Sequence, residues 1–213
     1  MLFIQNLLVY ILMFPIIGIL LLMLIPARKT RLLKFTALNS ACLSFVGSLI
    51  LWGSFNKSVG FFQFLVKTAW FPFLTLNFTL GVDGISIFFI ILTTLLIPLC
   101  ILASWNSVGH SLKEFLVAFL FLDFLLIGVF CVLDLLFFYI FFESVLLPMF
   151  LIIGIWGSRE RKILAAYYFF GRLRVLAPFL FNYIQFWIRG TSASCLGLYL
   201  AGLRYKSVFF LGM

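Results

Sequence analysis

The chain has 213 residues, of which 65% are hydrophobic and 10% are charged, and its formal net charge is +9. A soluble domain of this length cannot bury so much apolar surface, so the composition excludes soluble classes and indicates an integral membrane protein. A net positive charge can indicate nucleic-acid binding, but here the basic residues fall in short loops, where they set membrane orientation. We therefore expect a lipid bilayer as the partner of this chain, and no nucleic acid.

Five apolar runs are long enough to cross a membrane, since a spanning helix needs about 20 mostly apolar residues. They cover roughly residues 2–25, 35–53, 84–104, 114–133 and 135–155, and a sixth run begins near Ile163. Backbone polar groups find no water in lipid, so these runs must be helices, and the alternation typical of a barrel is absent. The expected fold class is an all-α polytopic membrane protein, a bundle of about five to six transmembrane helices.

The basic residues collect in alternate loops. Loop 26–34 holds four of them, loop 105–113 holds Lys113, and loop 156–162 holds three. The remaining loops between the spans hold only Lys57 and Lys67. The positive-inside rule therefore places the three basic loops in the cytoplasm or matrix and the N-terminus on the other side.

The long loop between the second and third spans is expected to carry structure of its own. Phe61–Lys67 alternates weakly, as in a strand that lies along the membrane surface. Gly81 and Gly84 predict breaks in regular structure. Asp83 is predicted to cap the third helix, because its oxygen can accept from the free N–H groups of the first turn. Asp134 begins the fifth span and favours the positive end of that helix dipole.

The sequence offers no cluster of metal ligands. The single histidine, His110, lies in a loop, and no CxxC or Cys/His pattern occurs. The cysteines are widely spaced in or beside apolar runs and are interpreted as small buried hydrophobic residues. They are Cys42, Cys100, Cys131 and Cys195. We therefore expect no metal site.

Two acidic residues lie inside apolar runs, Asp123 in the fourth span and Glu143 in the fifth. Glu143 lies ~13 Å along its helix, near the middle of a hydrocarbon core about 30 Å thick, and Asp123 has a similar depth. A carboxylate at that depth costs about 3 kcal/mol on insertion scales, so it should face the bundle interior and serve a function. Proton binding and release is the favoured role. The alternative is an acid hydrogen-bonded to a neighbouring helix for packing.

The neighbours of Glu143 fit a functional position. Tyr139 lies one turn earlier on the same helix face and could form a hydrogen bond to the carboxyl group. Pro148 lacks an N–H, which frees the carbonyl of Ser144 and allows a kink beside the acid.

Three segments resemble the antiporter-like membrane subunits of respiratory NADH:ubiquinone oxidoreductase, most closely the mitochondrially encoded subunit 4 family. They are AWFPFLTLNFTLGVDGIS, FFESVLLPMFLIIGIWG and RERKILAAYYFF. The resemblance covers residues 1–170 and implies the N-terminal part of an antiporter-like fold. It further implies that Glu143, in the FE-x-x-L-x-P-M motif, and Asp123, on the preceding helix, belong to a proton pathway.

The resemblance also implies a cellular setting. A subunit of this kind is a multi-pass protein of the mitochondrial inner membrane, and its partners are the other membrane-arm subunits of the complex. The complex transfers electrons from NADH to ubiquinone, while these subunits move protons and carry no redox centre. The cofactors expected are therefore NAD and ubiquinone for the complex, and none bound by this chain.

The sequence departs from the family after Phe170. Residues 171–213 place Arg172 and Arg174 within the expected sixth span, at about 2.5–3.5 kcal/mol each if centred. We expect this segment to be a divergent tail, produced by a frameshift or intron read-through and not native to the subunit. The chain is also shorter than half the family length, so activity in isolation is not expected.

Three interpretations stay open at this stage. The first is a proton-translocating subunit of the oxidoreductase. The second is a subunit of a multi-subunit cation/proton antiporter, because those proteins share the glutamate motif. The third is a non-functional fragment.

Overall fold

The computed structural model describes residues 7–56, 62–71, 76–106, 108, 111–157, 160, 161, 163, 166, 167, 169 and 171. The chain divides into two units, Met1–Ala166 and Tyr167–Met213, and the elements below all belong to the first unit. The expected tail, 171–213, lies almost entirely outside the described residues, as does His110.

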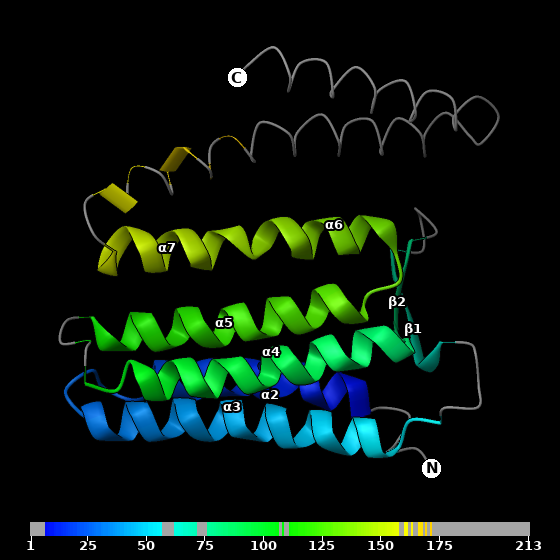
Figure 1. Cartoon of the computed structure of the whole chain (residues 1–213), viewed down its shortest axis with the longest axis horizontal. Helices are drawn as coiled ribbons and strands as arrows, with labels where there is room; N and C mark the ends of the chain where they lie inside the picture. The colour runs from blue at the N-terminus through cyan, green and yellow to red at the C-terminus, as the bar shows by residue number, and fades with distance from the viewer. Residues whose placement is uncertain are drawn as a thin grey trace. The chain divides into compact units, whose positions relative to one another are not determined.

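Within its described residues, the first unit contains six helices and one pair of strands (Figure 1). The helices are α2 (Leu7–Leu24), α3 (Thr30–Gly53), α4 (Gly84–Ala103), α5 (Leu112–Cys131), α6 (Leu135–Ser144) and α7 (Leu146–Trp156). The strands are β1 (Gln63–Phe71) and β2 (Leu76–Val82), which pair antiparallel. Within the described residues, five helical segments are long and apolar enough to cross a membrane, with α6 and α7 together forming the fifth. The five predicted spans are confirmed.

The second span begins earlier than predicted, at Thr30 and not near residue 35. The apolar pattern marks only the part of a helix inside the hydrocarbon core, whereas a helix can continue into the interface with basic side chains. Lys34 lies in that extension, and its amine donates to the backbone carbonyl of Trp105 and lies 5.4 Å from the centre of the Trp105 ring. A long lysine side chain can reach polar groups at the interface while its stem stays in apolar surroundings.

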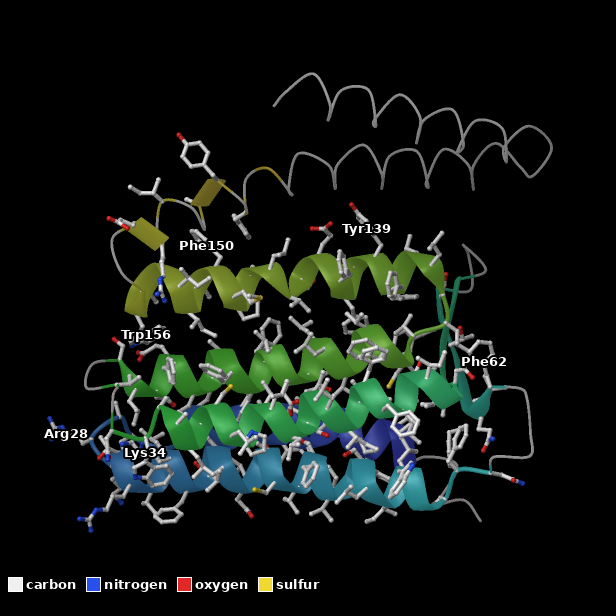
Figure 2. The ribbon with its side chains drawn as sticks, viewed as in Figure 1. Arg28, Lys34, Phe62, Tyr139, Phe150 and Trp156 are labelled. Carbon is white, nitrogen blue, oxygen red and sulfur yellow. The ribbon has the colours of Figure 1, made fainter. Side chains whose placement is uncertain are left out.

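A second lysine joins another pair of helix ends. The Lys113 amine, at the start of α5, donates to the carbonyls of Met23 at 2.9 Å and Ile25 at 3.0 Å, at the end of α2. These carbonyls are among those that a helix C-terminus leaves without an intrahelical partner. The first two basic loops therefore meet at one end of the bundle. Figure 2 shows Lys34 at the same end as Trp156, and Phe62 at the opposite end.

The segment between α3 and α4 forms a hairpin, so the strand predicted at Phe61–Lys67 is confirmed in part and its partner β2 was not predicted. The prediction that Gly81 breaks regular structure is wrong, because this residue lies within β2. A Cβ there would lie 2.8 Å from Leu133 Cδ1, so glycine permits close approach of the α5–α6 connection. The amide of Leu133 donates to the Thr79 carbonyl at 3.0 Å and fixes this contact.

The cap predicted at Asp83 is confirmed, and Asp134 lies at the start of a helix as predicted. The Asp83 carboxylate accepts a hydrogen bond from the Gly84 amide at 2.7 Å at the start of α4. The Asp134 carboxylate accepts from the Leu136 amide at 3.3 Å at the start of α6.

Helix α5 is the centre of the bundle. It contacts α2, α3 and α4 as well as α6 and α7. Figure 1 shows α5 between α4 and the layer of α6 and α7. Of the α5 span 50% is buried, against 17% of the span formed by α6 and α7. The span formed by α6 and α7 is therefore the least buried of the five.

Close approach of α2, α3 and α5 depends on a glycine. A Cβ on Gly18 would lie 2.1 Å from Ser40 Oγ, 2.6 Å from Ser40 Cβ and 3.0 Å from Leu120 Cδ1. Association of helices in lipid relies on van der Waals packing, and small residues allow the backbones to approach. The buried face of α3 is accordingly rich in alanine, serine and glycine.

We predict that Gly18→Ala lowers the free energy of unfolding by about 1–3 kcal/mol, because α2 or Ser40 must shift. Gly53→Ala is the matched control, since no described atom lies within 4 Å of a Cβ at that exposed position. Thermal unfolding followed by far-ultraviolet circular dichroism in detergent measures both. Equal midpoints for Gly18→Ala and the unmodified chain would contradict this packing.

Candidate functional site

A layer of buried polar side chains crosses the bundle between two apolar clusters. One cluster lies toward the hairpin and includes Ile11, Ile87 and Ile127; the other lies toward the basic loops and includes Leu22 and Leu120. The polar layer consists of Ser40, Ser44 and Ser48 on α3, Thr93 and Thr94 on α4, and Asp123 on α5. Apart from Ser40, which lies beside Ala41 of the second cluster, the members lie between the two clusters on their helices, near the middle of the spans.

All five hydroxyl groups of this layer have hydrogen-bond partners. Ser40 donates to the Phe14 carbonyl of α2 at 2.9 Å. The Ser48 and Thr94 hydroxyl oxygens lie 2.9 Å apart and join α3 to α4. Bonds of this kind satisfy polar groups that water cannot reach in lipid.

Asp123 is the exception in the layer. The residue is 0% exposed, and neither carboxyl oxygen has a hydrogen-bond partner among the described residues. The Ser44 side chain of α3 lies next to this carboxyl group. In the structure, however, its hydroxyl donates to the Ser40 carbonyl at 3.2 Å. A buried polar group without a partner costs about 1–3 kcal/mol, and a charged one costs more, so packing alone does not account for this acid.

Glu143 is also buried, at 8% exposure, and lies in the last turn of α6. Phe137 and Phe141 of the same helix pack on β2 and α5, with ring centres 5.0 Å from Phe78 and 5.8 Å from Phe124 respectively. A helix turns about 100° per residue, which puts Glu143 about 200° away from Phe141. Glu143 therefore lies on the side of α6 turned away from α5.

The two predicted acids are thus not brought together. Asp123 lies next to Ser44 of α3, whereas Glu143 lies on the far side of α6. Tyr139, four residues before Glu143, shares its helix face, and Figure 2 shows the tyrosine directed away from α5. The hydrogen bond expected between Tyr139 and Glu143 stays a prediction.

The irregularity predicted at Pro148 is confirmed. The last span is interrupted between α6 and α7 at Val145, one turn before the proline. Pro148 has no N–H for the Ser144 carbonyl, and the next bond, from the Met149 amide to the Val145 carbonyl, is long at 3.4 Å. The break follows Glu143 directly and leaves backbone polar groups beside the acid.

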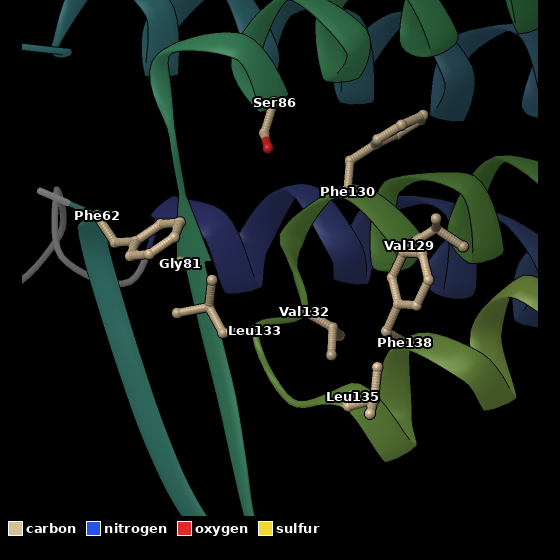
Figure 3. Close-up of a pocket in the computed structure, with 9 residues that line it drawn as sticks. All are labelled: Phe62, Gly81, Ser86, Val129, Phe130, Val132, Leu133, Leu135 and Phe138. Atoms are coloured by element: carbon tan, nitrogen blue, oxygen red, sulfur yellow. The ribbon is translucent and has the colours of Figure 1, made fainter. Parts of the chain in front are cut away.

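A pocket of about 370 Å³ lies near the hairpin end of the bundle and is separate from this layer (Figure 3). Its lining residues are Phe62, Gly81, Ser86, Val129, Phe130, Val132, Leu133, Leu135 and Phe138. Only Ser86 among them has a polar side chain, and none has an ionisable one. The pocket is therefore an apolar crevice without acid–base groups.

The predictions for the cysteines are corrected in part. Cys131 is buried as expected, but Cys42 and Cys100 are exposed on the outside of the bundle. Lipid is as apolar as the interior, so an apolar run does not reveal which side of a helix is buried. Cys195 lies outside the described residues. No group of three or more possible metal ligands occurs in the described part of the chain.

Sequence reasoning missed the hydroxyl groups of α3. The signal was available as Ser40, Ser44 and Ser48, whose spacing of four residues places them on one face of an apolar helix. It passed unnoticed because serine is common in membrane helices, and only the position of α5 shows that this face meets an acid.

Comparison with known proteins identifies the family. Residues 8–133 match the model described as NADH-ubiquinone oxidoreductase chain 4, amino terminus, and residues 132–196 match NADH:quinone oxidoreductase/Mrp antiporter, TM. The chain is 56% identical over 176 residues to NADH-ubiquinone oxidoreductase chain 4 of Chondrus crispus, covering 80% of this chain and 36% of the relative. The corresponding protein of Arabidopsis thaliana is 53% identical over 156 residues, covering 73% of this chain and 32% of the relative.

A solved structure is also similar to this chain. A chain of respiratory complex I from Thermus thermophilus with bound NADH matches with a TM-score of 0.61 and 27% identity, covering 75% of this chain and 31% of that chain. The present chain thus spans about a third of the length of the relatives it matches. With the sequence and structural matches in agreement, the chain belongs to the NADH-ubiquinone oxidoreductase chain 4 family.

Proposed function

We propose that this chain serves in the membrane arm of an NADH:ubiquinone oxidoreductase and takes part in proton translocation coupled to electron transfer from NADH to ubiquinone. The observation that carries this proposal is the burial of two carboxyl groups, Asp123 and Glu143, inside spans of a chain 4 family member. The partners would be the other membrane-arm subunits, and the location the mitochondrial inner membrane. NAD and ubiquinone would act elsewhere in the complex, with no cofactor bound by this chain.

The two acids would serve different parts of a proton route. Asp123 lies within the α2–α5 bundle beside the hydroxyl groups of α3 and α4, where a proton can be held in the middle of the membrane. Glu143 lies on the side of α6 turned away from α5. The relatives are more than twice as long as this chain, and the groups that exchange protons with Glu143 would include some from the remaining part of such a protein.

A cation/proton antiporter subunit is the second candidate. It is favoured by the description of the family model that matches residues 132–196, which includes the Mrp antiporter. The oxidoreductase is preferred because both relatives described above are named as its chain 4. Proton movement that depends on NADH supports the first candidate, whereas proton movement driven by a sodium gradient without NADH supports the second.

We expect Glu143→Gln, in the assembled complex, to reduce NADH-driven proton translocation at least tenfold, because the amide keeps the shape but cannot bind the proton. Glu143→Asp should retain part of the activity, since the carboxyl group remains and only its reach shortens. Acidification measured with a fluorescent dye in proteoliposomes gives the rate. Glu114→Gln is the control, because that glutamate is exposed at the start of α5 and should leave the rate unchanged. Normal translocation by Glu143→Gln would refute the assignment.

Asp123→Leu is expected to change the stability of the chain and its proton translocation in opposite directions. Removing a buried carboxyl group without a partner is expected to raise the free energy of unfolding by about 1–3 kcal/mol while proton translocation falls. Asp83→Ala is the comparison, since loss of the α4 cap should lower stability by about 1 kcal/mol. Thermal unfolding and the dye assay measure the two effects. A less stable Asp123→Leu chain would indicate that the acid serves packing.

We further propose the division into an antiporter-like region, 1–170, and a tail, 171–213, that is not native to the subunit. The matched family range reaches residue 196, so direct mapping of the protein is needed to fix this boundary. Mass spectrometry of the assembled complex should find no peptide that continues from Phe170 to Arg174. Detection of that peptide would show that the tail is an authentic part of the protein.

A further inference from the structure

Asp123 has a specific neighbour on another helix, and its identity suggests how the acid is held. We propose that Ser44 of α3 is the positioning residue of Asp123, through a hydroxyl group that alternates between the Ser40 carbonyl and the Asp123 carboxyl group. This inference deepens the proposed function and rests on it for the role of Asp123 as a proton carrier. Ser44 is not among the residues that the sequence singled out.

Ser44 is free to change its partner. Its hydrogen bond to the Ser40 carbonyl, at 3.2 Å, is longer than the usual range of about 2.5–3.0 Å for a hydroxyl donor. That carbonyl lies four residues earlier in α3, so it also receives the backbone N–H of Ser44 in the regular helical pattern. Rotation of the side chain toward Asp123 would therefore leave no backbone group without a partner.

Two other hydroxyl groups of the layer, those of Ser40 and Ser48, form hydrogen bonds to a neighbouring helix. Ser40 is bonded to the Phe14 carbonyl on α2 at 2.9 Å, and a Cβ on Gly18 would collide with its side chain, so it has little room to turn. Ser48 is paired with Thr94 on α4. Ser44 and Thr93 bond only within their own helices, and Ser44 is the one of the two that lies beside Asp123, whose carboxyl group has no hydrogen-bond partner among the described residues.

A hydroxyl group suits both forms of the acid. It can donate its hydrogen to an ionised carboxylate, and it can accept the hydrogen of a protonated carboxyl group while donating to a carbonyl. The Ser40 carbonyl is the acceptor for the second arrangement. Asp123 would then have a partner before and after a proton arrives, without movement of the helices.

The test uses the full chain in lipid bilayers, with carbon-13 in the side-chain carboxyl group of aspartate. The chain contains three aspartates, Asp83, Asp123 and Asp134, so solid-state nuclear magnetic resonance should resolve three carboxyl signals. The Asp123 signal is assigned by its loss in Asp123→Asn. Ser44→Ala should displace this signal, and Ser44→Thr, which keeps the hydroxyl group, should return it toward its original position.

Ser48→Ala is the matched control, because it removes a buried hydroxyl group one turn further along α3 that bonds to Thr94. It should leave the Asp123 signal in place. Unchanged Asp83 and Asp134 signals show that each variant is folded. An Asp123 signal that is unmoved by Ser44→Ala, or moved equally by Ser48→Ala, would overturn the proposal. Since this readout needs no turnover, it is independent of the translocation assay that tests the proposed function.

Discussion

Water is absent from the core of a bilayer, and this constraint governs every polar group of the chain. Where the structure can satisfy such groups internally, it does so at close range: Lys113 bonds the carbonyls at the end of α2, and Ser40 bonds the Phe14 carbonyl. Packing of α2, α3 and α5 is close enough for these bonds because Gly18 has no side chain. Against this background, the carboxyl group of Asp123, which has no hydrogen-bond partner among the described residues, is the group to which we assign a role in proton transfer.

The two acids lie in different parts of the bundle. Asp123 belongs to a core that α2, α3, α4 and α5 close around it, whereas Glu143 lies on the other side of the α6–α7 layer, next to the interruption at Val145. Helices α5 and α6 therefore separate the hydroxyl-lined region that holds Asp123 from the side of α6 that holds Glu143.

The sequence was sufficient where a local cause decides the structure. Span length and apolarity predicted the five spans. Asp83 predicted the cap of α4, Asp134 the start of α6, and Pro148 the irregularity of the last span. It was insufficient where contacts between distant segments decide: the pairing of β1 with β2, the exposure of Cys42, and the placement of Ser44 beside Asp123. Lipid adds to this difficulty, since an apolar surround removes the contrast that distinguishes the two sides of a helix in water.

The central claim is that buried carboxyl groups of this chain change their protonation during turnover. Infrared difference spectroscopy tests it most directly, by comparing the complex at rest with the complex oxidising NADH in the presence of ubiquinone. The account predicts carboxyl bands that appear during turnover and are lost in Asp123→Asn and in Glu143→Gln. Identical difference bands in the unmodified protein and in both variants would contradict it.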